Sequence, residues 1–209
     1  MSRTNTKKNA VLTVLSMVAA MILSKGLGLI RSTCMASAYG TGALEVSRTL
    51  QESHVNYLAV AVVDEGVELR KAGVTLPIII MDPEVAAFDL IIENNLQPNV
   101  YSFQVLEEII RAVETKGLEY LPVHIKIDSG MHRLGFYRED MPQLAARLQN
   151  QKAVHVASIF SHLAGSDEAQ FDAFTHEQAA YFQSCANSLI ASSPDSHIAS
   201  QPLLHLCNT

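Results

Sequence analysis

A loop with one permanent cation follows the most polar of the predicted strands. It spans residues 128–136, with the sequence DSGMHRLGF, and places Arg133 between Gly130 and Gly135. A guanidinium group stays charged at physiological pH, and the two glycines let the backbone approach a ligand closely. These residues are therefore the first candidates for a binding site.

Three further candidates stand where predicted elements begin or end. Ser161-His162 closes the next strand, with Asp167-Glu168 in the loop behind it, and Asn208-Thr209 closes the last strand. The segment Tyr39 to Gly42 opens a predicted helix over residues 43–53, where hydroxyl and amide groups suit an anion. Each has an ordinary structural explanation as well, since a lone histidine at a strand end is more often a packing residue than a catalyst.

The elements that would position these residues alternate between short apolar runs and amphipathic segments. Apolar residues at 106, 109, 110 and 113, and again at 88, 91 and 92, have the spacing of a helix with one buried face, and Gly73 and Gly117 stand where helices should end. Such alternation is typical of a parallel sheet, either doubly wound or part of an eight-stranded barrel. The predicted strands cover residues 57–61, 77–81, 100–102, 122–128, 157–163 and 203–208.

One strand favours the barrel. Apolar residues alternate with His124, Lys126 and Asp128 along residues 123–128. A central strand of a doubly wound sheet is apolar on both faces, whereas a barrel strand can turn a polar face to a ligand in the lumen. An edge strand facing water is the alternative. A buried Lys126 ammonium would be costly unless it were paired or modified.

Composition excludes several classes of function. The 209 residues are 48% hydrophobic and 17% charged, with a net charge of −6, which is ordinary for a globular protein and gives no broad attraction for nucleic acid. Cys34, Cys185 and Cys207 are too few and too far apart for a disulfide framework or a cysteine metal site. We expect no metal and a reducing, cytoplasmic setting.

The N-terminal region has a different character. Lys7 and Lys8 precede an apolar run over residues 10–23, which residues 26–30 extend. This pattern favours an apolar helix that contacts a membrane through residues 10–30. A secretory signal and a buried amphipathic helix are the alternatives.

The order of motifs after residue 42 resembles the alanine racemase family. The match covers residues 43–209 and is most specific in HIKIDSGMHRLGF, residues 124–136. Four further segments follow the family order: AVAVVDEGVELRKAG (59–73), PIIIMDP (77–83), SIFSHLAGSDE (158–168) and HLCNT (205–209). Their sequences are similar to the racemase halves of ligase–racemase fusions.

The resemblance implies an α/β fold: part of a parallel (β/α)8 barrel of the TIM type, which holds pyridoxal 5′-phosphate and interconverts L- and D-alanine for peptidoglycan. Family members are homodimers. By position, Tyr39 and Thr209 would contact the cofactor phosphate, and His162 would lie against the pyridine ring. Asn208 would also bind the cofactor. Arg133 would approach the phenolic oxygen and the substrate carboxylate, and Lys126, carbamylated in many relatives, would hold that arginine.

One departure from the family concerns its chemistry. The frame CMASAYGTG, residues 34–42, has Met35 where the family has the lysine that anchors the cofactor and exchanges the substrate proton. A thioether can do neither. The family's eighth strand and C-terminal domain, with its tyrosine base, are also not in the sequence. We therefore expect an isomerase by resemblance whose catalysis is lost, so that Met35→Lys alone should not restore it.

A second resemblance concerns residues 11–42. They are similar to the start of lipid II flippases, whose first helix ends in Gly-x-x-Arg before a Tyr-Gly-Thr turn. We expect two parts, a flippase-like segment over residues 1–42 and a racemase-like barrel over 43–209, joined within 36–42. The alternatives are a non-catalytic barrel that binds pyridoxal phosphate, or a flippase fragment fused to a racemase fragment.

Overall fold

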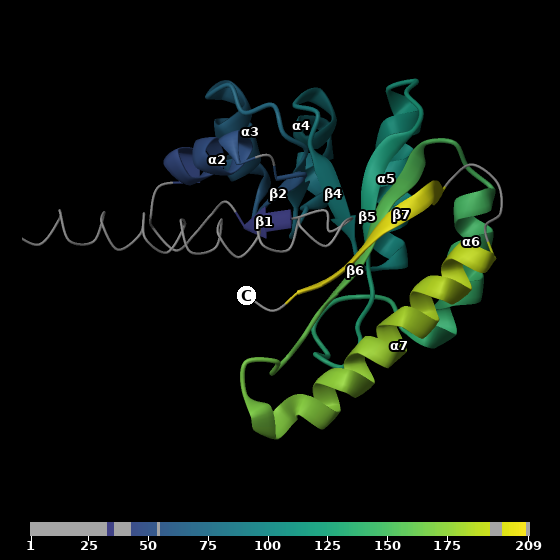
Figure 1. Cartoon of the computed structure of the whole chain (residues 1–209). Helices are drawn as coiled ribbons and strands as arrows, with labels where there is room; N and C mark the ends of the chain where they lie inside the picture. The colour runs from purple at the N-terminus through teal and green to yellow at the C-terminus, as the bar shows by residue number, and fades with distance from the viewer. Residues whose placement is uncertain (1–32, 36–42, 54, 193–197, 208–209) are drawn as a thin grey trace, which may run out of the picture. The chain divides into compact units, whose positions relative to one another are not determined.

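The computed structural model describes residues 33–35, 43–53, 55–192 and 198–207 (Figure 1). The predicted apolar helix of residues 10–30, Tyr39, Asn208 and Thr209 lie outside these residues. The chain divides into two compact units, one formed by residues 1–84 with 93–96 and the other by 85–92 with 97–209. We describe each unit by itself.

The first unit holds three parallel strands. Its β2 lies between β1 and β3, with Met35 of β1 in register with Ala59 of β2. The apolar pattern did not predict β1, because three residues are too few to establish a period. The elements are β1 (Thr33–Met35), α2 (Ala43–Glu52), β2 (Tyr57–Val60), α3 (Val63–Lys71) and β3 (Ile78–Ile80).

Two contacts set the packing of α3. A Cβ atom at Gly66 would lie 2.9 Å from Cδ1 of Ile80, so the helix can approach β3 only where it lacks a side chain. One helical turn later, the Arg70 guanidinium donates four hydrogen bonds of 2.7–3.1 Å to backbone carbonyls. The carbonyls belong to Val74, Leu76, Asn94 and Asn95. Arg70 therefore holds the turns before β3 and β4.

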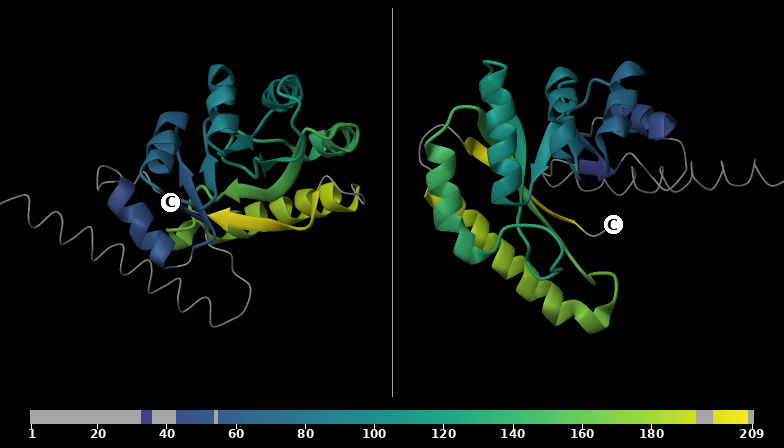
Figure 2. Two further views of the ribbon diagram at one scale, coloured as in Figure 1. Left: turned by 90° about the horizontal axis from the view of Figure 1, so that it is seen from above. Right: turned by 180° about the vertical axis from the view of Figure 1, so that it is seen from behind.

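The second unit contains a four-stranded parallel sheet. Its elements are η1 (Val85–Ala87), α4 (Phe88–Glu93), β4 (Gln97–Val100), α5 (Phe103–Thr115), β5 (Leu121–Lys126), η2 (Arg138–Asp140), α6 (Met141–Gln149), β6 (Val154–His162), η3 (Ala169–Phe171), α7 (Asp172–Ala191) and β7 (Ile198–Cys207). Figure 2 shows its helices along one side of the strands.

Strand order decides between the predicted architectures. Within the second unit each strand pairs in parallel with the strand before it in the sequence, in the order β4-β5-β6-β7. A doubly wound sheet reverses its direction of winding, whereas a barrel does not. Because β5 lies between β4 and β6, the alternative of an edge strand facing water is wrong.

The elements predicted after residue 42 are present, but three strands begin three or more residues earlier than predicted. β6 begins three residues earlier and β7 five residues earlier. The strand predicted over residues 100–102 lies over Gln97–Val100 instead. The reason is that the Ser102 hydroxyl accepts a hydrogen bond from the Val105 amide at 3.3 Å and so caps α5. Gly73 and Gly117 follow α3 and α5 with positive φ angles, as predicted for helix ends. In the described part of the chain, no helix is both long and apolar enough to span a membrane.

Candidate functional site

Basic side chains gather at the carboxyl ends of two neighbouring strands of the second unit. Lys126 is the last residue of β5, His162 is the last residue of β6, and Arg133 lies in the loop that follows β5. Only 5% of Lys126 is exposed, and its Nζ lies 5.8 Å from the centroid of the Phe160 ring. The structure thus brings together the three basic residues that the sequence predicted.

The positive charges of the cluster act on Lys126 and on His162. Burial lowers the pKa of Lys126, and the positive charge of Arg133 lowers it further, against a smaller opposite effect of Asp128. Burial also lowers the pKa of His162, followed by the charges of Lys126 and Arg133. Among the described residues, neither Lys126 nor Arg133 has an ion pair with a carboxylate. The cluster therefore repels further cations and suits an anion.

The loop that carries Arg133 folds back onto the end of β5. The Phe136 amide donates to the Lys126 carbonyl at 2.9 Å, and the Asp128 amide donates to the Phe136 carbonyl at 3.0 Å. Inside the loop, Oδ1 of Asp128 accepts hydrogen bonds from the amides of Gly130 and His132 at 2.9 and 3.0 Å. This arrangement fixes the backbone on both sides of Arg133.

Buried polar side chains anchor the neighbouring loop. Ser161 donates to the Ile127 carbonyl at 2.6 Å and lies 2.8 Å from the Ser129 hydroxyl, which ties β6 to the Arg133 loop. Gln178 of α7 accepts from the Ala164 amide at 3.1 Å and donates to the His162 carbonyl at 3.4 Å. These hydrogen bonds therefore fix the backbone of the loop after β6 and tie it to the loop that carries Arg133.

Sequence reasoning missed Gln178, although a signal was present. It stands four residues before Phe182, seven before Cys185 and eleven before Leu189, all buried on α7. A glutamine on the apolar face of a helix needs hydrogen-bond partners inside the protein. The spacing alone could have identified it as an anchor for a loop.

A row of polar side chains, buried in its middle and half-buried at its two ends, crosses the sheet two residues before Lys126 along β5. It joins Gln97 of β4, His124 of β5, Ser158 of β6 and His205 of β7. The prediction singled out His124 for its polar face, but not Gln97, Ser158 or a role for His205. Burial lowers the pKa of His124 to about 3 and that of His205 to about 4. Both rings are therefore neutral near pH 7.

The remaining predicted residues belong to other elements or are not described. Asp167 and Glu168 are exposed in the loop after β6. The backbone of Met35 belongs to β1 of the first unit, while Tyr39, Asn208 and Thr209 lie outside the described residues. The part of the chain that the structure describes contains no cluster of histidine, cysteine and carboxylate side chains suited to a metal ion.

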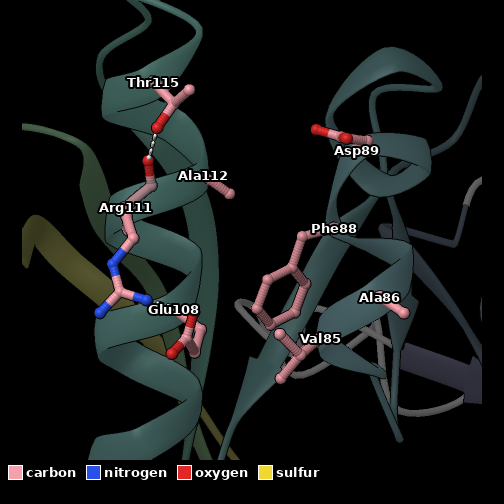
Figure 3. A pocket seen from close by; sticks show the side chains of 8 residues that line it. All are labelled: Val85, Ala86, Phe88, Asp89, Glu108, Arg111, Ala112 and Thr115. Carbon is pink, nitrogen blue, oxygen red and sulfur yellow. Dashed lines mark hydrogen bonds and ion pairs between the residues drawn. The ribbon is translucent and has the colours of Figure 1, made fainter.

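A cavity of about 200 Å³ lies elsewhere in the second unit (Figure 3). It is bordered by η1 and α4 on one side and by α5 on the other, with Phe88 facing the gap. Two of its charged residues, Asp89 and Glu108, are acidic and one, Arg111, is basic, so the lining does not favour an anion. The basic cluster is therefore the better candidate site.

Known proteins with a similar sequence or structure share one description. The family model of the alanine racemase N-terminal domain matches residues 32–209. The alanine racemase of Cutibacterium acnes is 38% identical over 176 residues, which are 83% of this chain and 45% of that protein. The alanine racemase of Streptococcus uberis is 40% identical over 156 residues, covering 74% of this chain and 41% of that protein.

A solved structure extends the likeness to the fold. The alanine racemase of Clostridium difficile 630 has a TM-score of 0.78 and 31% identity, and the match covers 94% of this chain and 52% of that one. The predicted α/β fold, part of a parallel barrel, is confirmed. The chain spans about half the length of the relatives that it matches. The family match begins at residue 32, eleven residues before the start that the motifs predicted, and so includes Met35.

Proposed function

Because this chain belongs to the alanine racemase family, we propose that its barrel binds pyridoxal 5′-phosphate reversibly and does not racemise alanine. The observation that carries the proposal is the basic cluster combined with Met35. Arg133 of the cluster supplies a permanent positive charge for an anionic cofactor, and the methionine side chain has no amine with which to bond it covalently.

The basic cluster fits the cofactor chemically. Pyridoxal phosphate carries a phosphate and a phenolic oxygen, and both are acceptors for charged donors. Arg133 would bind the phenolic oxygen, and His162 would lie against the ring. The positive charge of Arg133 lowers the pKa of Lys126, so an anion beside the two groups would relieve their repulsion.

Methionine at position 35 separates binding from catalysis. When bound, the cofactor acts as an electron sink for charge at the substrate α-carbon. Moving that proton requires a base beside the α-carbon, and in this family the base is the amine that also anchors the cofactor. A thioether accepts no proton near neutral pH. The remaining residues of the cluster can orient a ligand, but the family's proton exchange lacks its lysine.

Borohydride trapping tests the proposal directly. The purified chain is mixed with an equal amount of pyridoxal phosphate, reduced with borohydride and digested for peptide mass spectrometry. We expect cofactor that dialysis removes and no peptide modified in stoichiometric yield. The matched variant Met35→Lys should gain a reduced adduct at position 35, which shows that the site was otherwise able to receive the cofactor.

Two results would contradict the proposal. Stoichiometric trapping at a single lysine of the unchanged chain would show that another amine replaces the missing one. Formation of D-alanine from L-alanine by the unchanged chain, measured with a D-amino acid oxidase assay, would show that racemisation does not need it. Arg133→Met should weaken cofactor binding at least tenfold, whereas Arg111→Met, on the outer helix α5, should not change it.

We also infer the ligand class and assembly from the family. A small amino acid such as alanine is the expected second ligand, and a homodimer in the cytoplasm is the expected state. The mass of the purified chain by light scattering tests the dimer. For residues 1–42 we retain the proposal of a flippase-like segment, although the racemase family match already covers residues 32–42. Independent DNA reads across codons 30–45 would test the junction.

A further inference from the structure

The hydrogen bonds of the polar row all donate in one direction along it, and one residue sets that direction. We propose that Gln97 is a positioning residue that, through His124 and Ser158, determines which ring nitrogen of His205 carries the hydrogen. This inference concerns the protein without its cofactor, so it stands apart from the proposed function. The four side chains come from four adjacent strands and are joined by three hydrogen bonds.

The first step starts from the amide oxygen. Oε1 of Gln97 lies 2.9 Å from Nε2 of His124, and a carbonyl oxygen can only accept. The hydrogen of His124 must therefore be on Nε2. His124 has no exposed surface and its ring is neutral near pH 7, so Nδ1 carries only a lone pair.

The second step passes through the serine hydroxyl. Oγ of Ser158 lies 2.6 Å from Nδ1 of His124, and with a lone pair on that nitrogen the serine must donate. A hydroxyl has a single hydrogen. Toward Nε2 of His205, at 3.3 Å, Ser158 can then only accept, so the hydrogen of His205 is on Nε2 as well.

The result is a coupled row in which every donor points toward Gln97. Nδ1 of His205 is left as the acceptor, so the group that meets this nitrogen must be a donor. If the amide of Gln97 were turned round, all three hydrogen bonds would reverse and Nδ1 of His205 would become a donor. The two histidines and the serine therefore change together or not at all.

The orientation of the His205 ring is fixed independently. It stacks on Phe160 with 4.9 Å between the ring centroids and 7° between the planes, and Lys126 Nζ lies near the same Phe160 ring. Its tautomer is thus the property that the row can still set. As a neutral acceptor, Nδ1 of His205 would favour a group that offers a donor over one that offers a second acceptor.

Nitrogen NMR measures the tautomers directly. In the full chain labelled with ¹⁵N-histidine, two-bond nitrogen–proton correlations at pH 7 distinguish a hydrogen on Nε2 from one on Nδ1. We expect the Nε2–H form for both His124 and His205. A hydrogen on Nδ1 of either ring would overturn the proposal, and this measurement on the unchanged chain needs no variant.

Variants then test the direction of control. Ser158→Ala should leave His124 in the Nε2–H form and lower the Nε2–H share of His205, whereas Ser158→Thr should keep both. Gln97→Leu should lower the Nε2–H share of both rings. A merely structural role would not produce this asymmetry. A single Nε2–H form of His205 in a folded Ser158→Ala variant, with unchanged backbone amide shifts elsewhere, would show that the row does not set the tautomer.

Discussion

Gly135 passes so close to Asp128 that a Cβ atom at position 135 would lie 2.4 Å from the Asp128 backbone nitrogen. The φ angle of Gly135 is 135°, which residues with side chains rarely adopt. The crossing closes the loop that carries Arg133. The position of a charged side chain thus depends on a residue with no side chain at all.

Gly135→Ala should therefore damage the fold as well as the site. The added methyl group must push back the Asp128 backbone, and we expect a loss of at least about 3 kcal/mol in the free energy of unfolding. Urea denaturation followed by circular dichroism measures it. Gly117→Ala is the control, because Gly117 also has a positive φ but no atom within 4 Å of its Cβ position. Equal losses in the two variants would show that φ alone matters.

Arg70→Met should destabilise the first unit. The four carbonyls that Arg70 binds would lose a charged donor, and three of them belong to residues that are buried or half-buried. We expect a loss of about 3 kcal/mol in unfolding free energy. Arg111 is the matched control. Its side chain is 68% exposed and forms an ion pair with Glu108, so Arg111→Met should change stability by less than about 0.5 kcal/mol. A similar effect of both substitutions would contradict the role of Arg70.

Acid should destabilise the protein through its buried histidines. Burial lowers the pKa of His124 to about 3 and of His205 to about 4, whereas in the unfolded chain both titrate near 6.5. Between these values the unfolded chain binds more protons, so stability falls as the pH falls and levels off below the folded pKa values. From pH 7 to pH 5 we expect a loss of about 4 kcal/mol from the two residues together.

Urea denaturation at a series of pH values measures this dependence. His124→Gln should remove about half of the slope below pH 6.5, while the exposed His176→Gln should leave most of it. A pH dependence that is unchanged by His124→Gln would show that other groups dominate acid unfolding.

Lys126 should form a carbamate. Burial and Arg133 lower its pKa, so a larger share of the amine is neutral and can attack carbon dioxide. The new N–C bond forms as the nitrogen releases one proton, and the anionic product can pair with Arg133. In ¹³C-bicarbonate, carbon NMR should show one carbamate signal. Lys126→Arg should abolish the signal and Lys152→Arg, at an exposed position, should keep it. A signal that survives Lys126→Arg would place the carbamate elsewhere.

Much of the strand and helix pattern was readable from the sequence because its apolar runs are long enough to show a period. The alternation around His124, Lys126 and Asp128 also indicated a polar face correctly, and all three are buried. Shorter elements could not be found this way. β1 has three residues, and the start of β4 contains Pro98 and Asn99, which carry no strand signal.

The site residues were predicted mainly from the family motifs, and only in part from the alternation of polar and apolar residues. Arg133, Lys126 and His162 are close together because neighbouring parallel strands end at the same edge, which the order of motifs implied. Gln97 and Ser158 could not be paired with His124 from sequence, because their contacts span 27 and 34 residues and depend on strand register. Register is a property of the folded sheet, and a shift of one residue would turn each side chain to the opposite face.

The sequential strand order also bears on how the chain folds. Because each strand of the second unit pairs with the one just before it, every pairing closes a loop of one helix and its turns. Closing loops of similar, moderate length has a similar entropic cost at each step. The sheet can therefore grow from β4 toward β7 during synthesis, each new strand docking on an edge that is already formed. His205, which arrives last, would complete the polar row at the end of that growth.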